Sequence, residues 1–235
     1  MRQLAVPDAG SVRSLAWHPG GDRVAVVDVL GTVRVVDLLT GAPRAVLTRG
    51  ASGLPDAPVA WHPDPAPGND LLIVAGADGT VVRWNHAMDS AGGLYPRADE
   101  LFELGSAPGA FAWSDDGSRF AACGGGSVRI WDRAAPPPRR PAGRQVGGGE
   151  ITAAGWTSGG QYLLTALADS SRRADKVVSL TLWDAASGEQ VRSWTDVHGE
   201  FAPGRGIALS NRGNRIRVAC VRRGEAPAVY RLSVS

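Results

Sequence analysis

The chain has 235 residues, of which 43% are hydrophobic and 20% charged, and its formal net charge is +2. This composition is ordinary for a soluble fold, and a chain of this length can bury about 70 to 75% of its unfolded surface without disulfide or metal staples. The small net charge gives no indication of nucleic-acid binding, so we expect no nucleic acid among the partners.

The first predicted unit, residues 8–47, contains four short apolar runs separated by turn residues. The run that ends at Trp17 is followed by Gly21 and by the run RVAVV. That second run is too short for a helix and too uniformly apolar for a strand with one face exposed to solvent. The runs TVRVVD and RAVL follow. We therefore expect four antiparallel strands in this unit.

Four further units repeat this order of elements. Their second strands are LLIVAG, RFAACG, YLLTAL and RIRVACV, and the Asp78-Gly79 pair is the clearest hairpin signal. The units are predicted at residues 57–104, 107–146, 150–194, and 205–235 together with 1–7. No stretch longer than about 12 residues has helical periodicity, so the predicted fold class is all-β.

Tryptophan recurs at two positions of the repeat. We call these two positions the first and second columns. Successive tryptophans of the first column are 44, 52 and 43 residues apart, and those of the second column are 47 and 52 residues apart. A glycine such as Gly21 follows the first column by four positions, where a tight hairpin needs a residue with positive φ. A period in the forties that ends on Trp-Asp is typical of one four-stranded propeller blade per repeat. The anchors are Trp17, Trp61, Trp113 and Trp156 in the first column, and Trp84, Trp131 with Asp132, and Trp183 with Asp184 in the second.

The fifth unit contains only three predicted strands before the chain ends at Ser235. The segment Gln3 to Val6 precedes Trp17 by the interval that separates other fourth strands from the next anchor, so it is available as the missing strand. An open ring would expose strand edges that pair with other chains. We therefore predict a β-propeller of five four-stranded blades, closed by the N-terminal strand in the last blade.

These motifs resemble the WD-repeat propeller family over nearly the whole chain. The resemblance is carried by Trp131-Asp132, Trp183-Asp184, Trp84-Asn85, the strings WHPGGDRVAV and WSDDGSRFAA, and the turn ADGTVVRW. It implies a non-catalytic scaffold that presents loops to protein partners. The family's Gly-His pair before the first strand is absent from every unit, which implies that the buried hydrogen-bond tetrad built on that histidine is missing.

Catalytic and metal-binding groups do not gather in any recognisable pattern. The first strands of the units contain no Asp, Glu or His, so the paired carboxylates of a glycosidase are not expected, and Asp115 and Asp116 are predicted in a solvated turn. His18 and His62 occupy the same repeat position and are predicted to serve turns, while His86 and His198 lie in loops without a partner at ligand spacing. We expect no enzyme activity, no metal and no cofactor.

Partner binding is expected in the loops. Six basic residues fall on the side that carries the connections between second and third strands and between units, and together they would suit a carboxylate- or phosphate-bearing protein. Solvated loops are the alternative, because Asp169, Asp175, Asp196, Glu200 and Glu225 lie among them. The candidate partner-binding residues are Arg172, Arg173, Lys176, Arg205, Arg222 and Arg223.

The expected location is the cytoplasm. The segment MRQLAVPDAG is unlike a signal peptide, and no run approaches 18 apolar residues. Cys123 and Cys220 fall in non-adjacent units and are predicted to be buried thiols. Lys176 is the sole lysine, which is typical of a GC-rich bacterial genome.

Two other functions stay open. The chain could be the sensor or regulatory propeller of a larger bacterial signalling protein such as a kinase or NTPase, or a five-bladed propeller that binds or hydrolyses a small ligand. The sequence does not decide the oligomeric state.

Overall fold

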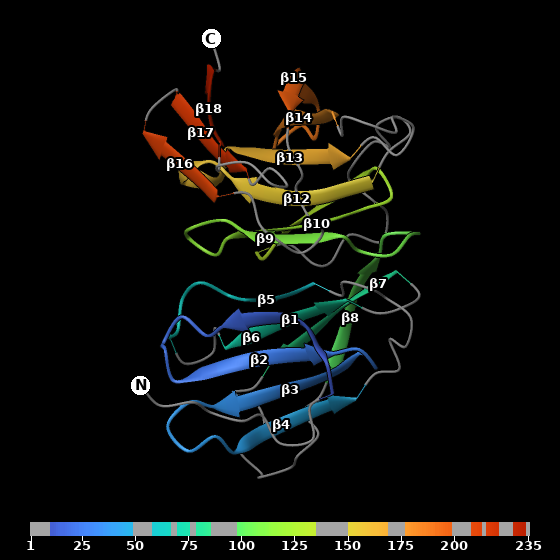
Figure 1. Cartoon of the computed structure of the whole chain (residues 1–235), viewed down its shortest axis with the longest axis vertical. Coiled ribbons are helices and arrows are strands. Elements are labelled where there is room, and N and C mark those ends of the chain that lie inside the picture. The colour runs from blue at the N-terminus through green and yellow to red at the C-terminus, as the bar shows by residue number, and fades with distance from the viewer. Residues whose placement is uncertain are drawn as a thin grey trace. The chain divides into compact units, whose positions relative to one another are not determined.

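Antiparallel β-strands make up almost all of the regular structure in the described residues, and the exception is a single 3-10 turn at Ser158–Gly160 (Figure 1). The computed structural model describes residues 10–48, 58–66, 70–75, 79–85, 98–134, 150–168, 177–198, 208–212, 215–220 and 228–233. The chain divides into two units, Met1–Pro108 and Gly109–Ser235, and each is treated by itself.

The first unit contains two four-stranded sheets, each with its strands in chain order. The second strand of each sheet is buried along its whole length, because both of its faces are covered, and the third strand is buried apart from partly exposed residues such as Arg34 and Arg83. The first sheet consists of β1 (Val12–Trp17), β2 (Arg23–Asp28), β3 (Thr32–Asp37) and β4 (Pro43–Thr48). The second consists of β5 (Val59–Trp61), β6 (Leu71–Ala75), β7 (Thr80–Asn85) and β8 (Ala98–Glu103).

The second unit contains three sheets, also with their strands in chain order. The third sheet consists of β9 (Ala110–Trp113), β10 (Arg119–Gly124) and β11 (Ser127–Asp132). The fourth consists of β12 (Glu150–Trp156), β13 (Tyr162–Ala168), β14 (Val177–Asp184) and β15 (Gln190–His198). The fifth consists of β16 (Ala208–Arg212), β17 (Arg215–Cys220) and β18 (Ala228–Ser233).

Two apolar clusters hold the sheets of the second unit together. Trp156, Leu163 and Trp183 of the fourth sheet pack with Ala121 and Cys123 of the third sheet. The opposite face of the fourth sheet contributes residues such as Leu164 and Leu180 to a cluster that includes strands β17 and β18. The fourth sheet is therefore buried on both faces by its neighbours in this unit.

Glycine meets a specific requirement in the turns. Gly79 has a φ of +84°, and a Cβ placed on it would lie 2.9 Å from the carbonyl oxygen of Ser106. Gly21, Gly117 and Gly160, which follow three of the first-column tryptophans, also have positive φ. The predicted role of glycine at this position of the repeat is confirmed for these three residues.

The register of the fifth sheet differs from that of the other sheets. In the first, third and fourth sheets the anchor tryptophan pairs with the residue seven positions later, as Trp156 does with Leu163. Leu209 instead pairs with Val218, nine positions later, because Arg212 still pairs with Arg215. Only residues 213 and 214, Gly-Asn in the sequence, lie between the paired ends, and this dipeptide favours a two-residue hairpin loop.

The all-β prediction and the order of the strands are confirmed in the described residues, which form five antiparallel sheets. The predicted fourth strand of the third unit, near residues 144–146, and the closing segment Gln3 to Val6 lie outside the described residues. The four-stranded form of every blade, the blade number and the closure of a ring remain predictions.

Candidate functional site

In the first two sheets, a buried histidine holds the turn after the first strand. Nδ1 of His18 accepts a hydrogen bond from the backbone N–H of Gly20 at 3.1 Å, and Nδ1 of His62 accepts one from Asp64 at 3.2 Å. Both imidazoles are almost fully buried. These contacts agree with the role in turns predicted for the two Trp-His-Pro motifs.

The third and fourth sheets use hydroxyl groups at the same position. The backbone N–H of Arg119 donates to Ser114 Oγ at 2.9 Å, and that of Tyr162 donates to Thr157 Oγ1 at 3.1 Å. The Thr157 hydroxyl also donates to the carbonyl oxygen of Tyr162 at 3.1 Å, whereas the Ser114 hydroxyl donates to Asp116 Oδ1 at 2.6 Å. Histidine, serine and threonine therefore serve one structural purpose at this position of the repeat.

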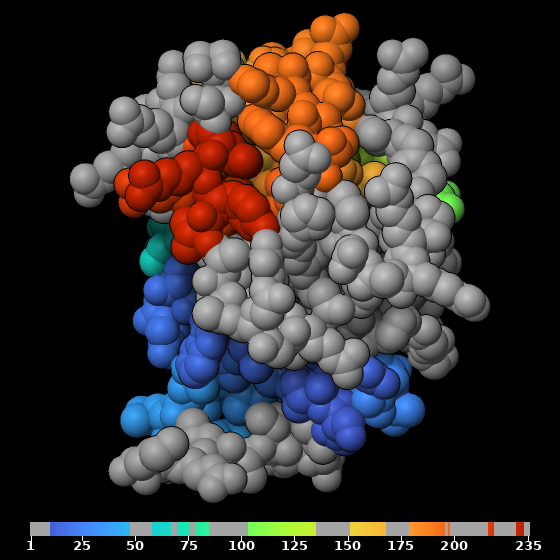
Figure 2. Space-filling view, turned by 45° about the horizontal axis from the view of Figure 1, so that its top comes forward, coloured from blue at the N-terminus to red at the C-terminus, as the bar shows by residue number. Residues whose placement is uncertain are grey.

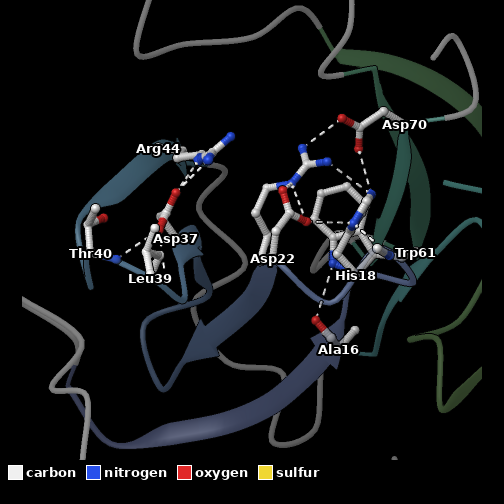
Figure 3. A network of polar contacts seen from close by, with 11 residues as sticks. Ala16, His18, Asp22, Asp37, Leu39, Thr40, Arg44, Trp61 and Asp70 are labelled. Carbon is white, nitrogen blue, oxygen red and sulfur yellow. Dashed lines mark hydrogen bonds and ion pairs between the residues drawn. The ribbon is translucent and has the colours of Figure 1, made fainter. Parts of the chain in front are cut away.

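A charged network surrounds His18 and joins the first two sheets of the first unit (Figure 3). The Arg23 guanidinium donates to Asp70 Oδ2 at 2.7 Å and lies 3.1 Å from His18 Nε2. On its other side, the imidazole lies 3.0 Å from Asp22 Oδ1. Trp61 closes the network, with its ring edge-on to His18 at a centroid distance of 5.0 Å and with Arg23 over its face.

Burial, followed by the charge of Arg23, lowers the pKa of His18 below its usual value of 6.5, although Asp70 and Asp22 act in the opposite direction. Both ring nitrogens lie within 3.4 Å of protein groups, and the side chain is 3% exposed. The imidazole is therefore positioned to hold the turn and the joint between the sheets, and it is poorly placed to exchange protons with a substrate.

Arginine at the start of a second strand reaches the following sheet in both units. Arg23 begins β2 and contacts Asp70, which directly precedes β6. Arg119 begins β10 and donates to the carbonyl of Gly160, just before β13, at 2.8 Å. The same position of the repeat thus links one sheet to the turn of the next by an ion pair in one case and by a hydrogen bond to the main chain in the other.

The first-column tryptophans provide a second link between neighbouring sheets. The indole N–H of Trp61 donates to the carbonyl of Ala16 at 3.2 Å, and that of Trp156 donates to the carbonyl of Ala112 at 3.0 Å. In both cases the acceptor directly precedes the anchor tryptophan of the preceding sheet. These indole–carbonyl links explain why the two side chains are buried together with their polar atom.

The aspartates that follow the second column form the turns between third and fourth strands. Asp37 Oδ1 accepts backbone N–H bonds from Leu39 and Thr40 (Figure 3), and Asp184 Oδ1 accepts them from Ala186 and Ser187. Asp132 accepts one from Ala134. These aspartates therefore have a structural role in the turns.

Their charge state follows from these bonds. The backbone N–H of Thr40, assisted by the Arg44 guanidinium, holds the pKa of Asp37 well below its usual range. The backbone N–H of Ser187 is the main cause of the lowered pKa of Asp184. Both carboxylates are thus acceptors at neutral pH, and neither is suited to act as a general acid.

Trp183 makes a buried polar contact inside the fourth sheet. Its indole N–H donates to Thr165 Oγ1 at 2.9 Å, and both residues are buried. A neighbouring threonine hydroxyl thus satisfies the indole within its own sheet.

The prediction that no first strand contains an acidic residue is wrong for the fourth sheet, because β12 begins at Glu150. The turn aspartate and the thiol considered for catalysis have structural roles. Asp116 accepts hydrogen bonds from Ser114 Oγ and from Ser118, which lower its pKa to about 2, and it lies in an exposed turn with Asp115 as predicted. Burial raises the pKa of the Cys123 thiol to about 12, so this thiol is unreactive at neutral pH. Within the described ranges, no three His, Cys, Asp or Glu side chains are grouped as metal ligands would be.

The six basic residues predicted to bind a partner, from Arg172 to Arg223, lie outside the described residues, and so does His86. The prediction that His198 lies in a loop is wrong, because it is the last residue of β15, where the structure describes only its backbone. In the described part of the chain, no helix is long and apolar enough to cross a membrane. The sequence analysis did not predict the network of Arg23 with Asp70. The strings WHPGGDR and WSDDGSR both place an arginine six positions after the anchor tryptophan, and this recurrence could have indicated a shared role.

Two stretches of the sequence and the fold of the chain resemble known proteins. Residues 2–37 and 106–132 match the family model described as WD domain, G-beta repeat. No curated protein matches the sequence significantly. Among solved structures, a chain of the crystal structure of the mitotic checkpoint complex matches with a TM-score of 0.67 and 17% identity. The match covers 95% of this chain and 61% of that one, so the chain spans about three-fifths of the length of the matched chain. Two stretches of the chain thus match the WD-repeat model, and the likeness to the solved structure is one of fold.

Proposed function

We propose that the protein is a non-catalytic scaffold that binds other proteins through the loops of a rigid β-sheet repeat. The observation that carries the proposal is the use of the polar groups. His18, His62, Asp37, Asp116 and Asp184 all hold turns or joints, so these five candidates for acid-base chemistry serve the framework. The WD-repeat matches support the same function, and the matched structure is itself a chain of a multi-protein complex.

The framework that we propose is a propeller of five blades, with Gln3 to Val6 as the fourth strand of the last blade. Five sheets in regular order and the repeated indole–carbonyl links support it. Small-angle scattering of the full chain tests it, because a closed ring is more compact than an open arc. A variant that lacks residues 2–7 should be less stable and more prone to associate through its open strand edge.

The loops remain the proposed partner-binding region, with Arg172, Arg173, Lys176, Arg205, Arg222 and Arg223 as the residues that would contact an acidic protein. The test is to capture a partner with the full chain as bait and then to measure its affinity for the wild-type chain and for a serine variant. Serine at positions 172, 173, 222 and 223 should weaken binding, and unchanged affinity would contradict the role of these loops. A thermal-shift screen with small ligands tests the enzyme alternative.

A regulatory propeller in a longer protein is the second candidate. Leu15 and Trp17 of β1 are 54% and 63% exposed, although the corresponding Ala154 and Trp156 of the fourth sheet are covered by the third sheet. This exposed face supports a further sheet or domain next to β1 in the functional protein. Sequencing of the gene upstream of this chain, together with expression of the longer product, would test this candidate.

A further inference from the structure

We draw no further inference here: the strongest candidate, the face of the fifth sheet (the sheet is red in Figure 2) on which the register places Arg217 opposite Arg231, belongs to the ring closure already proposed, and nothing in the described residues shows what covers it.

Discussion

The first strands of the first and fourth sheets carry the same sequence element in different surroundings. Trp156 of β12 is 6% exposed and Ala154 is 7% exposed, whereas Trp17 of β1 is 63% exposed and Leu15 is 54% exposed. The difference arises because the third sheet packs against β12 and offers the carbonyl of Ala112 to the Trp156 indole. The anchor tryptophan therefore stabilises the joint between sheets, and its contribution depends on the preceding sheet.

The largest expected effect is the loss of such a joint. Trp156→Ala should lower the free energy of unfolding by about 3 to 5 kcal/mol, because it removes a buried indole and leaves a cavity. Trp17→Ala should cost less than about 1 kcal/mol, because most of that side chain is already in water. Denaturant unfolding of the two variants measures the difference. Equal losses would show that Trp17 is also buried against a neighbour in solution.

A smaller effect is expected at the arginine links. Arg23→Met should destabilise the protein by about 2 to 3 kcal/mol, because it leaves Asp70 and His18 buried without their cationic partner. Arg119→Met removes a single hydrogen bond to the Gly160 carbonyl and should cost about 1 kcal/mol.

The double variant Arg23→Met with Asp70→Leu provides the control for the buried charge. Its loss should be smaller than the sum of the two single losses, because neither charge is then left alone. Additive losses in chemical denaturation would mean that the ion pair does not couple the two sheets.

The smallest effect is a dependence of stability on pH. The folded chain holds the pKa of His18 below 6.5, mainly through burial and then through Arg23, so the unfolded chain takes up the proton first as the pH falls. The free energy of unfolding should therefore decrease as the pH drops through about 6.5, and this decrease ends below the folded pKa. His18→Asn should have a shallower slope between pH 7 and 5, and an unchanged slope would contradict the buried network as its source.

Much of the fold could be predicted because the repeat is local. Trp17, Trp61 and Trp156 each end a first strand as expected, and Gly21 occupies a turn with positive φ, since alternation and turn chemistry act within a few residues. The register of β16 with β17 was not predicted. This register depends on whether Asn211 and Arg212 belong to the strand or to the turn. The sequence is compatible with both a short and a longer turn here.

The site was less accessible to prediction than the fold. The contact of Arg23 with Asp70 joins residues 47 positions apart, and only the packing of two sheets brings them together. The opposition of Arg217 and Arg231 follows from the register of β17 with β18, which the sequence analysis did not assign. The six loop residues proposed to bind a partner were chosen from charge alone, and they lie outside the described residues.

The indole–carbonyl links have a consequence for how such a chain can evolve. Each link takes its acceptor from the main chain, at Ala16 and at Ala112, and every residue type supplies that oxygen. The sequence of one repeat can drift, or a repeat can be duplicated, without a matching substitution in its neighbour. To keep such a link between two sheets, evolution then needs to retain only the tryptophan that donates the hydrogen bond.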